Sequence, residues 1–181
     1  TALENTDKYL FDREHKVIKL FTPPFSDGDT TPGYIKGYCP GYRENGGQYT
    51  HAAIWLPLAF IENGDADHGW EMLYSILPQS HDISEYKKEP FVIPADVCSD
   101  PERVGMGGWT WYTGSAGWYY RAAVETLLGI KLKDGNLTVN PNLPSHWDGY
   151  EAEIKLSDTV YKIKVKKGLT GEYTVEIDGK K

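Results

Sequence analysis

Residues 113–139, TGSAGWYYRAAVETLLGIKLKDGNLTV, decide the fold class, because a helix pattern in them is followed at once by a strand pattern. Up to Leu128 the apolar residues recur at helical spacing, and Gly129 stands where a glycine commonly ends a helix. From Ile130 the period falls to two residues, and Asp134-Gly135 is typical of a two-residue hairpin turn. The helix face expected to be buried consists of Ala116, Tyr119, Tyr120, Ala123 and Leu127.

The same two periods divide the rest of the chain. Towards the C-terminus, apolar and charged residues alternate in three stretches. This alternation predicts an antiparallel sheet with one solvent-exposed face. Towards the N-terminus, the spacing favours helices over residues 13–21 and 48–63, with Pro57 as a kink, and a further helix that Asp65 caps and Pro78 ends. The chain is therefore predicted to be α+β, with a helical part at 1–129 and an antiparallel β part at 130–181.

The composition excludes several classes of protein. The net charge is -7, and an acidic chain does not collect phosphate backbones, so we expect no nucleic acid partner. We see no signal peptide, no membrane segment and no metal-ligand spacing. Cys39 and Cys98 are far apart, so a reducing, cytoplasmic setting is the simplest expectation. Aromatic residues make up 13% of the chain, a content that suits stacking on sugar rings as well as core packing.

A polar motif, RENGGQYTH at residues 43–51, precedes one of the expected helices. It gathers a cation, a carboxylate, amides and an imidazole around two glycines, so it can direct many hydrogen bonds at a ligand. Arg43, Glu44 and His51 are its candidate binding residues. The alternative interpretation is structural, with Glu44 capping the helix and His51 packed in the interior.

An aromatic motif, WTWYTGSAGW at residues 109–118, leads into a helix start. The first turn of a helix offers unpaired N–H groups and partial positive charge, which attract anions. Gly114 would let an anion approach the backbone, and the hydroxyl of Thr113 could donate a hydrogen bond. The alternative is a simple Ser/Thr cap beside an aromatic core.

A third motif, EPFVIPAD at residues 89–96, presents Asp96. A pair made of Glu44 and Asp96 would suggest a glycosidase that uses two carboxylates.

Together these motifs resemble the carbohydrate phosphorylases of glycoside hydrolase family 94. The resemblance is carried by residues 33–38, 43–51, 89–92 and 111–118, and by a later stretch from Leu128 to Trp147. It therefore covers nearly the whole chain. The amino-acid sequence at residues 95–97 and 109–111 is most similar to the branch of the family that acts on β-1,2-linked glucans. This branch includes the phosphorylase part of cyclic glucan synthases.

This resemblance implies an (α/α)6 barrel followed by a β-rich piece. It implies cleavage of a β-glucosidic bond by inorganic phosphate with inversion, which gives α-glucose 1-phosphate. Phosphate is then a substrate, and no cofactor is implied. By resemblance, His51, Thr113 and Gly114 match the phosphate contacts of the family, Arg43 and Glu44 match its sugar subsites, and Tyr38 lies near them.

The sequence departs from the family in one respect. The catalytic aspartate of the family lies in an Asp-Trp-Asn-Asp type motif upstream, which this sequence lacks. The resemblance therefore implies a C-terminal segment with the last helices of the barrel and no catalytic residue of its own. Its expected partners are an oligosaccharide, phosphate, and the missing barrel portion or a second copy. Two alternatives stay open, a non-catalytic carbohydrate-binding module and a segment of an inverting glycoside hydrolase.

Overall fold

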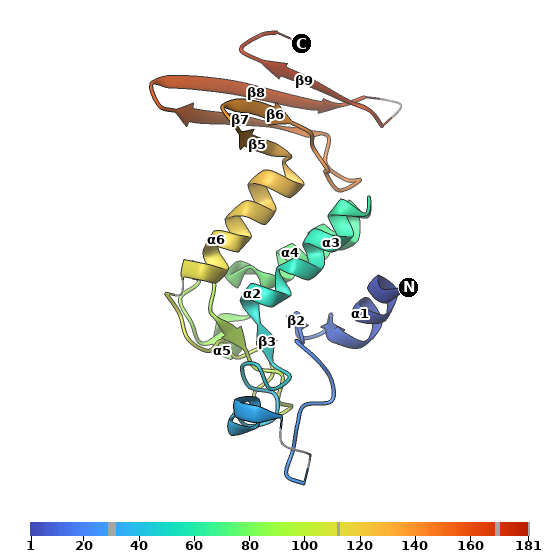
Figure 1. The fold of residues 1–181 in the computed structure, drawn as a ribbon, viewed down its shortest axis with the longest axis vertical. Helices are drawn as coiled ribbons and strands as arrows, with labels where there is room; N and C mark the ends of the chain where they lie inside the picture. The colour runs from blue at the N-terminus through green and yellow to red at the C-terminus, as the bar shows by residue number, and fades with distance from the viewer. Residues whose placement is uncertain (29–31, 112, 169–170, 181) are drawn as a thin grey trace.

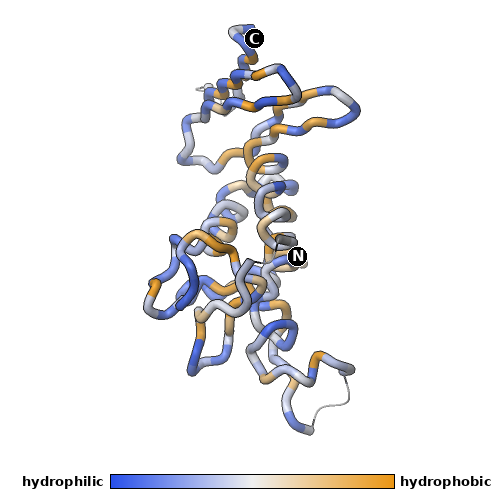
Figure 2. The backbone as a smooth tube through the Cα atoms, turned by 90° about the vertical axis from the view of Figure 1, so that its left-hand side faces the viewer, coloured by the Kyte–Doolittle hydropathy of each residue, from blue (hydrophilic) through white to orange (hydrophobic). Residues whose placement is uncertain are grey.

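Helices fill the middle of the molecule, and the C-terminal strands form one end of it (Figure 1). The structure, a computed structural model, describes residues 1–28, 32–111, 113–168 and 171–180. In the view turned by 90°, the molecule is again elongated, with the C-terminal strands at one end and loops at the other (Figure 2). The combination of helices with small antiparallel sheets confirms the predicted α+β class.

The N-terminal region begins with a helix, α1 (Ala2–Leu10), followed by a small hairpin of β1 (Phe11–Asp12) and β2 (Val17–Ile18). Thr1 and Glu4 close a capping box at the start of α1. The helix predicted over residues 13–21 is wrong. Lys16 has a φ of 57°, which makes a turn there, and the apolar residues Val17 and Ile18 are buried in the hairpin.

The predicted helix over residues 48–63 is divided into three pieces. These are strand β3 (Gln48–Tyr49) and helices α2 (Thr50–Ala53) and α3 (Trp55–Glu62). Pro57 lies in the first turn of α3, where its missing N–H removes no helical hydrogen bond. The next helix, α4 (Ala66–Ile76), is capped by Asp65 as predicted, and α3 packs against α4.

The long segment after α4 is mostly loop, as predicted, but it contains short elements. They are η2 (Pro78–Ser80), α5 (Ile83–Tyr86) and β4 (Asp96–Val97); a further short helix, η1 (Gly33–Gly37), lies earlier in the chain. Strand β4 pairs antiparallel with β3, so a segment from the middle of the chain reaches back to the start of α2.

The last helix is α6 (Thr113–Arg121), which continues as the π-helix η3 (Ala122–Leu127). Gly129 ends it with a φ of 71°, as predicted. Leu127 is buried, but Ala116 and Tyr120 are exposed, and Tyr120 keeps 65% of its surface in solvent. For these two residues the predicted burial is wrong.

The C-terminal part contains a hairpin and a separate three-stranded sheet. The hairpin joins β5 (Ile130–Lys133) to β6 (Asn136–Val139) through Asp134 and Gly135, which both have positive φ. The sheet has the order β7 (Gly149–Leu156), β8 (Thr159–Lys167), β9 (Tyr173–Ile177). Ile163 and Val165 are buried on its inner face, as the alternation predicts.

Two apolar clusters hold these parts together. One lies among the helices around Ile54, Met72 and Leu73, and the other lies between η3 and the C-terminal strands around Ile163. Trp147 packs against both clusters, so it joins the helical part to the β part. Within the described ranges, no helix is both long and apolar enough to cross a membrane.

Candidate functional site

The pairing of β3 with β4 brings the three sequence motifs together. Tyr49 lies opposite Asp96 in this pairing, and the N–H of Thr50 donates to the carbonyl of Ala95 at 2.9 Å. On the other side, the N–H of Ala95 donates to the carbonyl of Trp109 at 2.6 Å. The motifs that begin at residues 43, 89 and 109 are therefore neighbours, although they are far apart in the sequence.

His51 lies beside the first turn of α6. A Cβ placed on Gly114 would be 3.9 Å from the Nδ1 atom of His51. The imidazole also packs on Trp55, with ring centres 5.4 Å apart, and on Trp118, with ring centres 5.6 Å apart. The structure thus places a half-buried imidazole next to a glycine at the start of a nine-residue helix.

Thr113, the third residue expected at this place, begins α6, but its side chain lies outside the described part of the chain. The geometry of the imidazole and Gly114 is nevertheless suited to an anion. Helix starts offer N–H groups with partial positive charge, and a glycine leaves the space that a ligand needs.

Arg43 is enclosed by aromatic rings and carboxylates. Its guanidinium carbon lies 4.2 Å from the ring centre of Trp109 and 5.4 Å from that of Tyr38. Its Nε donates to Glu44 Oε2 at 3.4 Å, and Nη1 lies 4.0 Å from Asp96 Oδ1. Burial lowers the pKa of Arg43, but the nearby charges of Asp96 and Glu44 outweigh this effect and raise it, so the guanidinium stays charged.

One polar atom of Arg43 lacks a hydrogen bond. Nη1 is buried and has no hydrogen-bond partner among the described residues. Unpaired buried donors are rare in folded proteins and are costly, so such an atom is a candidate contact for a bound acceptor.

A pocket of about 640 Å³ opens beside this arginine. Tyr38, Arg43, Asp96 and Trp109 are among the residues that line it. Trp109 is 59% exposed, so part of its indole is accessible from solvent. An aromatic face with a few convergent polar groups is the usual composition of a sugar site. Glu44 does not line this pocket; it lies against Arg43 instead.

Asp96 is the residue at this pocket whose place the sequence does not predict. It is only 4% exposed, and the N–H of Trp109 donates to its Oδ1 at 3.4 Å. Burial raises the pKa of Asp96 above its usual value, and the Trp109 N–H and Arg43 only partly offset this. The sequence singles out Asp96 only as a partner of Glu44. It does not predict that Asp96 lies beside Arg43, because this proximity results from the pairing of β3 with β4, which are far apart in the sequence.

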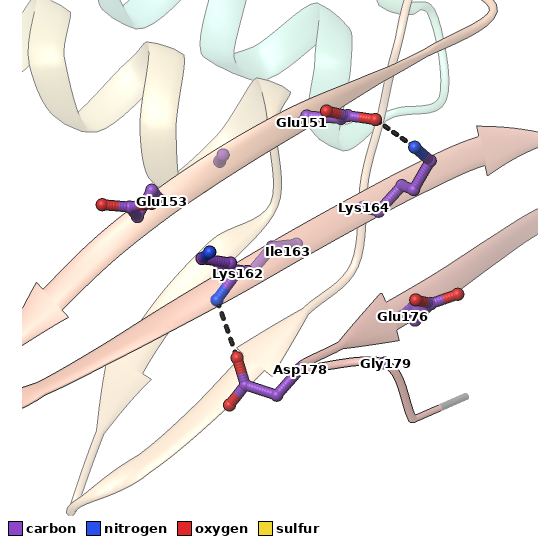
Figure 3. Close-up of a pocket in the computed structure, with 9 residues that line it drawn as sticks. Glu151, Glu153, Lys162, Ile163, Lys164, Glu176, Asp178 and Gly179 are labelled. Atoms are coloured by element: carbon purple, nitrogen blue, oxygen red, sulfur yellow. Dashed lines mark hydrogen bonds and ion pairs between the residues drawn. The ribbon is translucent and has the colours of Figure 1, made fainter.

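A different hollow, of about 500 Å³, lies on the outer face of the C-terminal sheet (Figure 3). Its lining is a ladder of opposite charges across the strands. Glu151 forms an ion pair with Lys164, and Asp178 accepts a hydrogen bond from the backbone N–H of Lys162. Opposite charges face one another across the strands, and none of the site residues predicted from the sequence lines this hollow.

Comparison with known proteins gives two family matches. The profile described as "Glycosyl hydrolase 94 superfamily, catalytic domain" matches residues 1–129, and that described as "Glycosyl hydrolase family 65, C-terminal domain" matches residues 130–180.

Individual relatives agree with these matches. The cyclic beta-(1,2)-glucan synthase NdvB of Rhizobium meliloti is 46% identical over 98% of this chain, which corresponds to 6% of that protein. The N,N'-diacetylchitobiose phosphorylase of Vibrio furnissii is 28% identical over 91% of this chain and 21% of its own length. The 1,2-beta-oligoglucan phosphorylase of Listeria innocua is 27% identical over 77% of this chain and 14% of its own length. The chain therefore spans a quarter or less of the length of these relatives.

Proposed function

The chain belongs to the glycosyl hydrolase 94 superfamily, and from this membership we propose that it is the C-terminal segment of an inverting carbohydrate phosphorylase. The parent enzyme cleaves a β-glucosidic bond with inorganic phosphate and releases α-glucose 1-phosphate. The observation that carries this proposal is the position of the His51 imidazole beside Gly114 at the start of α6, with open space between them that a Cβ on Gly114 would enter.

The proposed reaction requires little chemistry from this segment. In an inverting hydrolase, one carboxylic acid protonates the leaving oxygen and a second carboxylate activates water. Phosphate is already an anionic nucleophile, so it replaces both the water and the general base, and only one protein acid is needed. We propose that this acid is supplied from outside the 181 residues of this chain.

The role of the His51 region is to hold phosphate. The imidazole and the backbone N–H groups near Gly114 together form half of an anion site, to which the family resemblance adds Thr113. Trp55 and Trp118 pack against the imidazole and fix the ring in place. A held phosphate presents its oxygen at a defined angle to the anomeric carbon, which is how positioning accelerates a displacement.

The role of the Arg43 pocket is to hold the sugar. Trp109 offers a face for stacking, and Arg43 offers a buried Nη1 that lacks an acceptor. Tyr38 lines the same pocket, whereas Glu44 contributes by fixing the Nε side of the guanidinium. Asp96 positions Arg43 from the opposite side.

The two matched regions support a division of the chain into two proposed parts. Residues 1–129 are the last portion of an (α/α)6 barrel, and residues 130–181 are a C-terminal β piece that covers its end. The glucan-related relatives favour β-1,2-linked glucose as the substrate.

Phosphate binding tests this function directly. Titration with inorganic phosphate, followed by the NMR signals of the His51 imidazole, should give saturable shifts in the wild-type chain. Gly114→Ala should abolish them, because the added methyl fills the space beside Nδ1. Gly117→Ala is the matched control, since a Cβ there meets no atom of the described chain within 4 Å. Equal binding by the two variants would contradict the proposal.

Activity provides the second arm of the test. Because the chain lacks a general acid, we expect no release of α-glucose 1-phosphate from β-1,2-glucooligosaccharides and phosphate. Clear turnover by the chain alone would overturn the assignment as an incomplete segment. Hydrolysis without added phosphate would instead favour a glycosidase that uses the buried Asp96, whose raised pKa suits a proton donor.

A further inference from the structure

Asn45 is fully buried, with 0% of its surface exposed, in the loop that carries Arg43 and Glu44. Its side-chain amide joins two other segments of the chain. Oδ1 accepts a hydrogen bond from the backbone N–H of Phe25 at 2.8 Å, while Nδ2 donates to the carbonyls of Phe25 at 3.0 Å and of Tyr38 at 2.8 Å. One buried side chain therefore ties Tyr38, which lines the Arg43 pocket, to the segment around Phe25.

These hydrogen bonds require an amide at residue 45. The amide of asparagine has one acceptor oxygen and a nitrogen with two donors. In Asn45 both donors face carbonyl oxygens, and the oxygen faces an N–H group. A carboxylate of the same shape would turn an oxygen towards both carbonyls, and a hydroxyl has only a single donor. Because a buried polar group with all its bonds made rigidifies its surroundings, Asn45 fixes the backbone of Tyr38.

The main chain of Asn45 closes the turn that presents Arg43. Its N–H donates to the carbonyl of Tyr42 at 2.9 Å, and its carbonyl accepts from the N–H of Gly41 at 2.8 Å. Arg43, inside this turn, has a φ of 47°, an uncommon value for a residue with a side chain. A backbone of this kind persists only where its surroundings hold it, and such residues cluster at functional sites. The bonds of Asn45 therefore help to hold Arg43 in this conformation.

Asn45 thus connects two groups of the pocket that contact each other. The guanidinium carbon of Arg43 lies 5.4 Å from the ring centre of Tyr38. Asn45 is bonded to Tyr38 through its side chain and to the turn of Arg43 through its main chain. Asn45 itself lies behind the wall of the pocket rather than in it. Its side chain can therefore influence a ligand only through the positions of Tyr38 and Arg43.

We propose that Asn45 is a positioning residue of the sugar site, which places Tyr38 and Arg43 for a glucan without touching it. This inference rests on the proposed function, since it names what orders the pocket assigned to the sugar. A preformed pocket binds more tightly because fewer side chains have to be ordered when the ligand arrives. The proposed phosphate site should not depend on Asn45, because the ring of His51 is held by Trp55 and Trp118.

Asn45→Ser tests this role with two ligands on one chain. Serine has a single donor, so at least one of the two carbonyls loses its partner. Quenching of Trp109 fluorescence by β-1,2-glucooligosaccharides should show an affinity about tenfold lower, since a small displacement of binding groups has effects of this size or more. The phosphate titration of His51 should give the wild-type affinity. Loss of both ligands would assign Asn45 a merely structural role and refute the inference.

Asn142→Ser is the matched control. Asn142 also donates from Nδ2 to a backbone carbonyl, that of Thr126 at 2.9 Å, but it lies outside the pocket. Both variants should lower the Tm of the chain, whereas only Asn45→Ser should weaken sugar binding. An oligosaccharide affinity of Asn45→Ser equal to that of the wild type, or a loss of the same size in Asn142→Ser, would overturn the inference.

Hydrogen exchange on the wild-type chain gives a test that needs no folded variant. If Asn45 and the sugar site are coupled, bound sugar must stabilise the contacts of Asn45 in return. Saturating oligosaccharide should therefore slow the exchange of the Phe25 N–H more than that of the Ile18 N–H. Ile18 donates to the amide oxygen of Gln48 at the same distance of 2.8 Å, so it reports general stabilisation alone. Equal slowing of the two N–H groups would contradict the coupling.

The two ligands also separate this inference from the proposed function. If the wild type binds both ligands and Asn45→Ser binds sugar equally well, only the role of Asn45 is refuted. A wild-type chain that binds phosphate but no oligosaccharide refutes the sugar role of the Arg43 pocket, and the role of Asn45 with it. Sugar binding that depends on Asn45 in a chain that binds no phosphate supports the positioning role and refutes the phosphate role of His51.

Discussion

The backbone of Gly108 passes so close to Asp96 that a Cβ on Gly108 would lie 2.2 Å from the carboxylate oxygen Oδ2. The two residues are also joined through the main chain, because the N–H of Gly108 donates to the carbonyl of Asp96 at 2.8 Å. A methyl group at residue 108 would overlap the carboxylate as it stands, so the glycine leaves Asp96 its place beside Arg43. We therefore expect a side chain at residue 108 to disturb the Asp96–Arg43 arrangement.

We expect Gly108→Ala to weaken sugar binding without unfolding the chain. The added methyl displaces the Asp96 carboxylate, and Arg43 then loses the charge that fixes its Nη1 side. Misplacement of a binding group by about 1 Å can cost up to about a hundredfold, so a loss of roughly tenfold in oligosaccharide affinity is expected. Quenching of Trp109 fluorescence by β-1,2-glucooligosaccharides would measure it.

Gly37→Ala is the control for this prediction. Gly37 lines the same pocket, but a Cβ there meets no described atom within 4 Å. If both variants bind as the wild type does, the Asp96–Arg43 arrangement is not what holds the sugar.

The burial of Asp96 predicts a distinctive pH dependence of stability. Its pKa is raised in the folded chain, mainly by burial. Its contribution to stability is therefore fully present below the unfolded pKa of about 3.9 and is lost as the pH rises through the folded pKa. Asp96→Asn cannot ionise, so the Tm of this variant minus that of the wild type should increase from pH 3 to pH 7. A difference that stays flat between pH 3 and pH 7 would contradict the prediction.

Local signals in the sequence predict most of the individual elements. Asp65 caps α4, Gly129 ends the last helix, and Asp134-Gly135 turns the β5–β6 hairpin, each through chemistry confined to a few residues. The capping box of Thr1 and Glu4 was equally local and would have placed the first helix at residues 2–10.

Other features depend on contacts that no local pattern contains. Strand β4 pairs with β3 across almost fifty residues, and this pairing alone sets Asp96 beside Arg43. The predicted burial of Tyr120 failed for a different reason. Its helix carries the apolar pattern of an enclosed element, but the described chain contains nothing that covers that side.

We expect Gly129→Ala to be among the most destabilising single changes in the chain. Gly129 has a φ of 71°, and a Cβ there would lie within bonding distance of the Asn140 carbonyl, 1.8 Å from its oxygen. Thermal unfolding should show a loss of about 3 kcal/mol or more, typical of a steric clash added to backbone strain.

Gly64→Ala isolates the steric part of this loss. Gly64 has a similar φ of 87° but no described atom within 4 Å of its Cβ position, so only the strain of about 1–2 kcal/mol should remain. Equal losses in the two variants would show that contact with Asn140 is unimportant.

The last prediction concerns Asp67, which links α4 to the C-terminal part. Its Oδ1 accepts a hydrogen bond from the backbone N–H of Ser145 at 2.6 Å, and this bond is the main reason that the pKa of Asp67 is lowered. The same segment is held by Lys167, whose Nζ donates to the carbonyl of Ser145 at 2.8 Å. Asp67→Ala should therefore cost about 1 kcal/mol at pH 7, a modest value because the group is exposed to solvent.

The pH dependence identifies the charge as the cause. A lowered pKa means that the stabilisation is present above the unfolded pKa of about 3.9 and is lost as the pH falls through the folded pKa. The difference in Tm between Asp67→Ala and the wild type, roughly 2–4 °C at pH 7, should therefore shrink towards zero near pH 2. Asp67→Asn keeps an acceptor oxygen without the charge, so its loss at pH 7 should be smaller than that of Asp67→Ala, and it should also shrink at low pH as Asp67 of the wild type becomes protonated. A loss in Asp67→Ala that persists unchanged at pH 2 would instead assign the effect to packing of α4 against the segment around Ser145.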